Sequence, residues 1–163
     1  MASKTTNLVA DWDPNRAAEI ISAHLGLEGP ALPILHGLQA AFGCVPSEAI
    51  PMVAKALNRS RAEIHGVVTF YHDFREAPAG KTVVKLCRAE ACQAVGGREA
   101  ASFLLASLGI GWGETTPDGA VTVEPVYCLG LCAAAPAALV NGEPHGRLDG
   151  MSLIEAVAED AQP

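Results

Sequence analysis

The segment Val126-Tyr-Cys-Leu-Gly-Leu-Cys132 places two cysteines directly after a short run typical of a β-strand. The run Thr82-Val-Val-Lys-Leu86 leads in the same way into Cys87, with Cys92 five residues further on. The spacing is therefore Cys-x4-Cys, 35 intervening residues, and Cys-x3-Cys. If the two strands are neighbours, their ends bring four thiols together, because a rigid sheet holds the loops at its edge. Four thiolates bind either a tetrahedral metal ion or an iron–sulfur cluster.

The spacing of these cysteines leaves three kinds of site open. All four thiolates of a structural zinc site surround one ion, whereas a [2Fe–2S] cluster takes two thiolates on each iron. Two short-range disulfides are the third alternative, disfavoured because nothing in the chain suggests secretion. The fifth cysteine, Cys44, has no partner at ligand spacing and is predicted to be a small buried residue. Three histidines with no clustered partners are predicted to be surface or packing residues: His36, His65 and His72.

Composition and charge argue against nucleic-acid binding and membrane insertion. Of 163 residues, 50% are hydrophobic and 18% charged, and the net charge is -7, which is typical of a globular chain. Only 11 residues are Lys or Arg and no two are adjacent, which argues against nucleic-acid binding. No apolar run approaches the roughly 18 residues of a membrane span. The first residues also lack an apolar signal-peptide segment, so we expect a cytoplasmic protein that is not inserted in a membrane.

Helical patterns occupy the first half of the chain. Residues 1–13 carry few apolar anchors and are expected to be loosely ordered. Hydrophobic residues then recur at helical spacing, with start and stop signals, so a helical bundle is predicted over 14–75. Its four helices are expected to begin at Asp13-Pro14, Ala31, Ser47 and Ser60, with caps from Ser47 and from a Ser60/Glu63 capping box, and with Gly43 after the second helix.

A different pattern follows the Pro/Gly-containing segment 76–80. Residues 81–163 are predicted to form an α/β domain in the order β, α, β, β, β, α. The helix over 98–108 is expected to bury Phe103, Leu104 and Leu108, and Asp118-Gly119 is expected to turn a hairpin. The remaining predicted elements are the strands 82–86, 113–117, 120–124 and 137–140, the turn at Asn141-Gly142, and the helix 151–158.

These motifs together resemble the thioredoxin-like [2Fe–2S] ferredoxins, which include the roughly 24-kDa subunit of respiratory NADH:quinone oxidoreductase. The resemblance covers about residues 14–160 and extends to three further segments: 32–39 (Leu-Pro-Ile-Leu-His-Gly-Leu-Gln), 66–71 (Gly-Val-Val-Thr-Phe-Tyr) and 135–142 (Ala-Pro-Ala-Ala-Leu-Val-Asn-Gly). It implies an N-terminal helical bundle followed by a thioredoxin-like α/β domain. It also implies a [2Fe–2S] cluster on Cys87, Cys92, Cys128 and Cys132 and no catalytic residues on this chain.

The first cysteine loop, Cys87-Arg-Ala-Glu-Ala-Cys92, indicates a particular branch of this family. It is most similar to the gamma subunit of soluble NAD-dependent formate dehydrogenases that contain molybdenum or tungsten. This implies an electron-transfer subunit that docks on an FMN- and NAD-binding flavoprotein, in a complex with the formate dehydrogenase catalytic subunit. The alternatives are the equivalent subunit of NADH:quinone oxidoreductase or NAD-reducing hydrogenase, a freestanding ferredoxin, and a structural zinc module held by the four cysteines. A thiol oxidoreductase is disfavoured, because the chain has no Cys-x2-Cys pair.

Overall fold

The computed structural model describes residues 11–160, so most of the segment predicted to be loosely ordered lies outside the described residues. The chain divides into two compact units, with the boundary between Pro78 and Ala79. Both helices and a four-stranded sheet are present among the described residues, which confirms the predicted mixture of α and β structure. Each unit has its own hydrophobic core and is described separately.

The first unit contains four helices: α1 (Pro14–His24), α2 (Ala31–Phe42), α3 (Ala49–Ala56) and α4 (Arg61–Phe70). The Asp13 carboxylate accepts a hydrogen bond from the Asn15 N–H at 2.9 Å and caps α1 as predicted. Gly43 ends α2 in the left-handed conformation, with φ 75°. The Ser60 and Glu63 side chains form the predicted reciprocal capping box at the start of α4.

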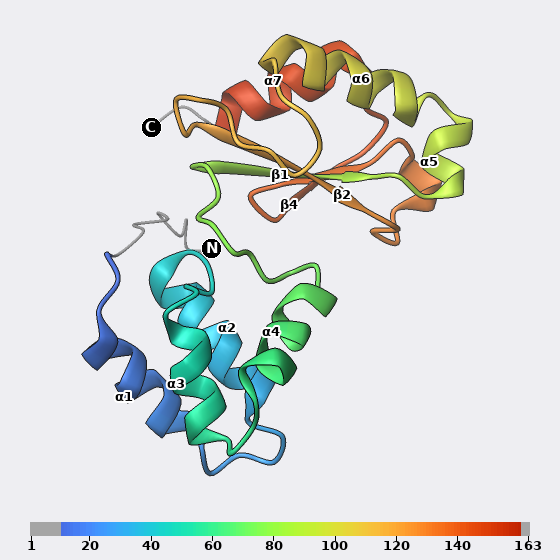
Figure 1. Ribbon diagram of the computed structural model, residues 1–163. Helices are drawn as coiled ribbons and strands as arrows, with labels where there is room; N and C mark the ends of the chain where they lie inside the picture. Colours follow the sequence, from blue (N-terminus) through green and yellow to red (C-terminus); the bar gives the residue numbers. More distant parts are fainter. Residues whose placement is uncertain (1–10, 161–163) are drawn as a thin grey trace. The chain divides into compact units, whose positions relative to one another are not determined.

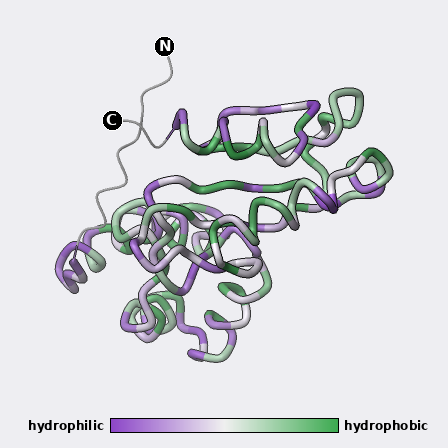
Figure 2. The backbone as a smooth tube through the Cα atoms, turned by 90° about the horizontal axis from the view of Figure 1, so that it is seen from above, coloured by the Kyte–Doolittle hydropathy of each residue, from purple (hydrophilic) through white to green (hydrophobic). Residues whose placement is uncertain are grey.

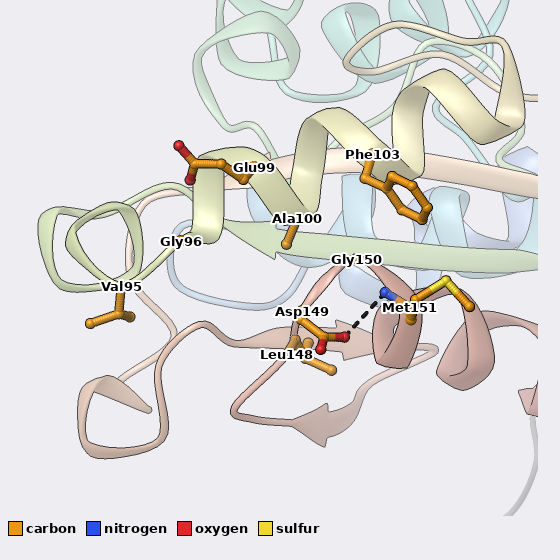
Figure 3. A pocket seen from close by; sticks show the side chains of 9 residues that line it. All are labelled: Val95, Gly96, Glu99, Ala100, Phe103, Leu148, Asp149, Gly150 and Met151. Carbon is orange, nitrogen blue, oxygen red and sulfur yellow. Dashed lines mark hydrogen bonds between the residues drawn. The ribbon is translucent and has the colours of Figure 1, made fainter.

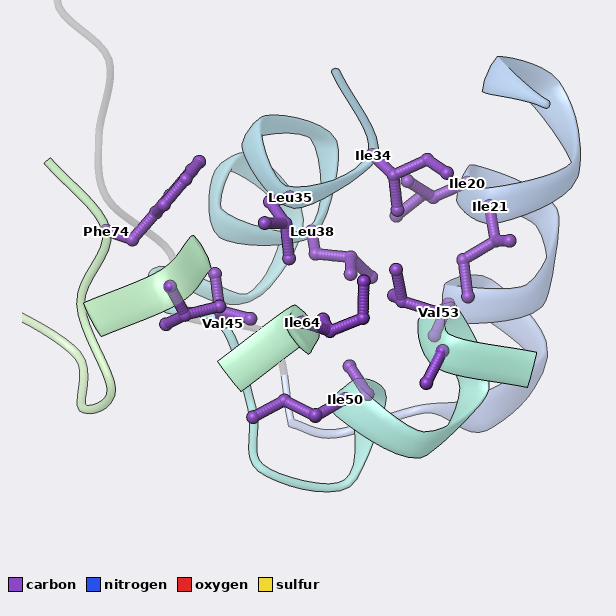
Figure 4. Packing of buried hydrophobic residues seen from close by; sticks show 14 of the residues in the cluster. Ile20, Ile21, Ile34, Leu35, Leu38, Val45, Ile50, Val53, Ile64 and Phe74 are labelled. Atoms are coloured by element: carbon purple, nitrogen blue, oxygen red, sulfur yellow. The ribbon is translucent and has the colours of Figure 1, made fainter. Parts of the chain in front are cut away.

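The core of this unit is built from one apolar face of each helix. Figure 4 shows Ile34, Leu35 and Leu38 of α2 directed toward side chains from the other three helices. Leu38 and Val53 are fully buried and Ile64 is 2% exposed. Burial of such side chains stabilises each of them by about 1.5–3 kcal/mol, and this sets the packing of the helices.

The start of α3 differs from the prediction. Ser47 does not cap the helix: its hydroxyl donates to the Glu48 carboxylate at 3.0 Å, and α3 begins at Ala49. The N–H groups of Ala49 and Ile50 bond instead to the carbonyls of Pro46 and Ser47. A turn therefore satisfies the donors that a capping side chain would have taken.

The second unit is a mixed sheet in the order β2-β1-β3-β4. Strands β1 (Thr82–Cys87) and β2 (Val121–Val126) pair in parallel, and β3 (Ala138–Val140) and β4 (Glu143–His145) continue the sheet antiparallel. The helices are α5 (Glu90–Ala94), α6 (Gly97–Leu108) and α7 (Gly150–Asp160). Figure 1 shows α6 and α7 on the same side of this sheet, where Leu104 and Leu153 pack against Val84 and Val123.

Three features of this unit depart from the prediction. Phe103 is 46% exposed, because Ala100, Ala101 and Leu104 form the face of α6 that packs inward. The turn at Asp118-Gly119 joins β2 to a segment that contributes only a single bridge, Thr115 to Thr122, and no full strand. The short elements α5 and β4 were not predicted, although the Asn141-Gly142 turn before β4 was, with φ 46° and 88°.

Hydrophobic and hydrophilic residues are interspersed along the elements of both units (Figure 2). Within residues 11–160, no helix has the length and apolar character needed to cross a membrane.

Candidate metal centre

The paired parallel strands bring both cysteine loops to one edge of the sheet. Cys87 is the last residue of β1 and lies in register with Val126, the last residue of β2. The Cys87 N–H donates to the Ala137 carbonyl at 3.1 Å, and the next N–H, that of Arg88, donates to Val126 at 2.7 Å. Cys128 follows two residues after the end of β2. The two cysteine loops therefore follow the ends of neighbouring strands, as the sequence predicted.

The four thiols form two close pairs, and the two pairs interact electrostatically with each other. The Sγ atoms of Cys128 and Cys132 lie 3.9 Å apart, and the thiols of Cys87 and Cys92 are hydrogen-bonded to each other. Cys132 interacts electrostatically with Cys87, which belongs to the other pair. All five cysteines are free thiols, so the structure does not adopt the disulfide alternative.

Backbone N–H groups point toward the sulfur atoms. The Gly130 N–H donates to Cys128 Sγ at 3.4 Å, and Gly130 adopts a φ of 77° that favours glycine. Cys128 itself has a φ of 113°, which is uncommon for a residue with a side chain and is typical of functional loops. N–H groups around the sulfurs are what an iron–sulfur cluster uses to set its reduction potential.

The pKa values of the thiols differ because their surroundings differ. Burial raises the pKa of Cys87, but hydrogen bonds outweigh this effect and the net pKa lies below its ordinary value. The donors are the Ala89 N–H, the Cys92 thiol and the N–H groups of Leu129 and Cys128. Burial and then the neighbouring Cys87 raise the pKa of Cys92, and Cys128 raises that of Cys132. A bound metal removes this mutual repulsion, because it favours all the thiolates at once.

The donor set is suited to a two-iron cluster, which takes two thiolates on each iron. The sulfurs lie as two pairs on neighbouring loops, with N–H donors around them. Within residues 11–160, no three His, Cys, Asp or Glu side chains are grouped closely enough to hold a single metal ion. Cys87 and Cys92 are 7% and 2% exposed, whereas Cys128 and Cys132 are exposed.

The other candidate residues belong to the first unit. Cys44 belongs to the first unit and is 7% exposed, and burial followed by the charge of Glu48 raises its pKa. His36 stacks on Phe74 with ring centroids 4.8 Å apart, and His65 Nε2 lies 3.4 Å from a Glu76 carboxylate oxygen.

A cavity of about 470 Å³ in the second unit is distinct from the cysteine site. Figure 3 shows Phe103 of α6 beside Gly150 and Met151 at the start of α7, and none of the cysteines lines the cavity. The Asp149 carboxylate at its edge is occupied in capping α7, because it accepts from the N–H groups of Met151 and Ser152. We assign no chemistry to this cavity.

Comparison with known protein families shows which family the chain belongs to. Residues 17–160 match the family of thioredoxin-like [2Fe–2S] ferredoxins. The chain belongs to this family. Membership confirms the predicted thioredoxin-like domain, and the [2Fe–2S] cluster is the cofactor of this ferredoxin family.

Several proteins are similar to this ferredoxin over most of its length. It is 34% identical to NADH-quinone oxidoreductase subunit 2 of Thermus thermophilus, over 81% of this chain and 73% of that one. NADP-reducing hydrogenase subunit HndA of Solidesulfovibrio fructosivorans is 32% identical, over 81% and 77%. A crystal structure of an NAD+-reducing [NiFe]-hydrogenase in the H2-reduced state superposes with a TM-score of 0.64 at 27% identity. That match covers 77% of this ferredoxin and 22% of the hydrogenase chain.

Sequence reasoning missed one contact of the first cysteine loop. Trp112 carries the guanidinium of Arg88 over its ring, with Cζ 4.7 Å from the ring centroid. The two residues are 24 positions apart and lie on different segments, so no local sequence signal connects them.

Proposed function

We propose that this chain is the electron-transfer [2Fe–2S] subunit of an NAD-linked oxidoreductase complex. The observation that carries the proposal is the convergence of two thiol pairs at the carboxyl ends of β1 and β2, with backbone N–H groups directed at the sulfurs. In this proposal Cys87 and Cys92 bind one iron, and Cys128 and Cys132 bind the other. The subunits of NADH-quinone oxidoreductase and hydrogenase among its relatives support this role.

A [2Fe–2S] cluster supplies one-electron storage and transfer, and the protein contributes its environment. The N–H groups of Gly130, Ala89 and Leu129 stabilise negative charge on the sulfurs. Burial protects the thiolates of Cys87 and Cys92 from water. The exposed thiolates of Cys128 and Cys132 then mark the side on which a redox partner approaches most closely.

We further propose that the complex is a soluble NAD-dependent formate dehydrogenase. The sequence Cys87-Arg-Ala-Glu-Ala-Cys92 supports this assignment. The chain then docks on the FMN- and NAD-binding flavoprotein, and a molybdenum or tungsten subunit oxidises formate. Residues 14–75 would serve as a docking bundle and residues 81–163 as the cluster domain. NADH:quinone oxidoreductase and NAD-reducing hydrogenase are the alternatives that the relatives' names favour.

The cluster assignment is tested on anaerobically purified, dithionite-reduced full-length protein. We expect two irons per chain and an S = 1/2 electron paramagnetic resonance signal. Replacing any of Cys87, Cys92, Cys128 or Cys132 by Ala should lower the iron content and abolish or alter the signal. The matched control, Cys44→Ala, should retain both. One zinc per chain without a signal would overturn the electron-transfer role and leave a structural metal domain.

The assignment to a complex requires a separate experiment. The chain is expressed with its candidate flavoprotein and catalytic subunits. The purified assembly is supplied with NAD+ and either formate or H2 and, in a separate assay, with NADH and a quinone. Formate-dependent NADH formation that is lost with Cys87→Ala and kept with Cys44→Ala is the expected result. NADH formation from H2 but not formate, or NADH oxidation with quinone only, would refute the formate dehydrogenase assignment while leaving the cluster assignment intact.

A further inference from the structure

The backbone of Arg88 is held between the two cysteine loops. Its N–H donates to the Val126 carbonyl at 2.7 Å, next to the start of the second loop. Its carbonyl accepts from Gln93 Nε2 at 2.7 Å, and Gln93 Oε1 accepts in turn from Arg98 Nη2 at 2.8 Å. The backbone of the residue that follows Cys87 is therefore fixed by a bond to the end of β2 and by a bond to Gln93, which connects it to α6.

The side chain of Arg88 is also held in place, although it is exposed. Its Cζ lies 4.7 Å from the centroid of the Trp112 ring, within the range of a cation–π interaction. Trp112 is partly buried against the core of the second unit, and the next N–H, that of Gly113, donates to the Val123 carbonyl of β2 at 2.8 Å. The indole is thus a rigid support beside β2, and it restricts the guanidinium from moving freely in solvent.

We propose that Trp112 holds the Arg88 cation in the first cysteine loop, one residue after Cys87, and that this fixed charge raises the reduction potential of the cluster. The inference rests on the proposed function. Addition of one electron increases the negative charge at the site by one unit, so a nearby cation stabilises the reduced form more than the oxidised form. The chain has a net charge of -7, which opposes this change. Arg88 supplies a local positive charge one residue after Cys87, and arginine suits the role because its planar group stacks on an aromatic ring.

The test is a potentiometric titration of the full-length protein, followed by the electron paramagnetic resonance signal of the reduced cluster. Arg88→Gln should lower the potential, by as much as a tenfold change in the equilibrium constant for reduction, which is about 59 mV for one electron. Lys81→Gln is the matched control, since it removes the same charge directly before the amino end of β1, six positions before Cys87. It should leave the potential almost unchanged. Equal shifts in the two variants would overturn the proposal, because they would report net charge and not a placed cation.

A double-mutant cycle tests the role of Trp112. Trp112→Leu should lower the potential when Arg88 is present and have no further effect on Arg88→Gln, whereas Trp112→Phe should keep most of the wild-type potential. Raising the ionic strength should shrink the difference between wild type and Arg88→Gln. An effect of Trp112→Leu that is the same with and without Arg88 would refute positioning through the cation. If Arg88→Gln failed to load iron, the comparison of Trp112→Leu with Trp112→Phe would still decide the point.

These results separate the two proposals. A wild-type protein without a [2Fe–2S] signal refutes the proposed function and this inference with it. A wild-type signal with an unchanged potential in Arg88→Gln overturns the inference alone.

Discussion

Gly97 is the residue at which a single methyl group should disturb the cysteine site. It is the first residue of α6, and a Cβ at this position would lie 2.6 Å from the Cys92 carbonyl oxygen and 2.9 Å from its carbonyl carbon. Ordinary contacts begin near 3.4 Å, so Gly97→Ala requires the Cys92 backbone or the start of α6 to shift. Such overpacking costs about 1–3 kcal/mol. Alanine's better helix propensity offsets up to about 1 kcal/mol of this, so a net destabilisation of ~1–2 kcal/mol is expected.

The assay uses the two tryptophans, one in each unit. Trp12 packs on Phe42 in the first unit and Trp112 lies in the second, so a Trp12→Phe background reports unfolding of the cluster unit by fluorescence. Gly97→Ala should lower the melting temperature of this unit by about 4–16 °C, since 1 kcal/mol corresponds to ~4–8 °C for a domain of this size. The iron content of the purified protein should also fall, because Cys92 is displaced.

Gly66→Ala is the matched control for this substitution. Gly66 lies inside α4 and has no atom within 4 Å of a Cβ built on it, so the same change should stabilise the first unit by about 0.5–1 kcal/mol. A Trp112→Phe background reports this effect through Trp12. The reasoning is refuted if Gly97→Ala keeps wild-type stability and full iron content, or if both substitutions change stability in the same direction.

Four further predictions concern the Ser60 cap, the Asn141 turn and the core of the first unit. Ser60→Ala should cost about 1 kcal/mol in urea unfolding at neutral pH. Hydrogen bonds from Ser60 lower the pKa of the Glu63 carboxyl in the folded protein. The stability that the ionised carboxylate contributes is therefore complete above its ordinary pKa of 4.5 and is lost as the pH falls through the lower pKa of the folded state. Unfolding measured as a function of acid pH checks this. Both Asn141→Gly and Asn141→Ala remove the oxygen that accepts the Val83 N–H at 2.8 Å. Alanine also disfavours the φ of 46° at this position, whereas glycine adopts it readily. The Asn141→Ala variant should therefore have a free energy of unfolding about 1 kcal/mol lower than Asn141→Gly, measured by thermal unfolding. Leu38→Ala, at a fully buried position, should destabilise the first unit by about 2–5 kcal/mol in the Trp112→Phe background.

Local rules predicted the elements that depend on residues close together in the chain. The caps at Asp13 and Ser60, the span 31–42 with Gly43 after it, and the strand that ends at Cys87 are all present in the structure. Each depends on contacts three or four residues apart or on an apolar periodicity. Ser47 shows the limit of such rules, because a turn supplied the hydrogen bonds that a capping side chain would otherwise make.

Some features of the candidate site likewise depend on residues close together in the chain, and others depend on tertiary packing. The order of the residues alone indicated which thiols belong together within each loop and that each pair follows a strand. Tertiary packing set the parallel pairing of β1 with β2, the N–H groups around the sulfurs and the position of Trp112 under Arg88. It also decided that Phe103 faces outward, since small residues on α6 make the contact with the sheet. The strand pairing joins residues 39 positions apart and the Arg88–Trp112 contact joins residues 24 positions apart. Such pairings depend on the packing of the whole unit, which no local pattern contains.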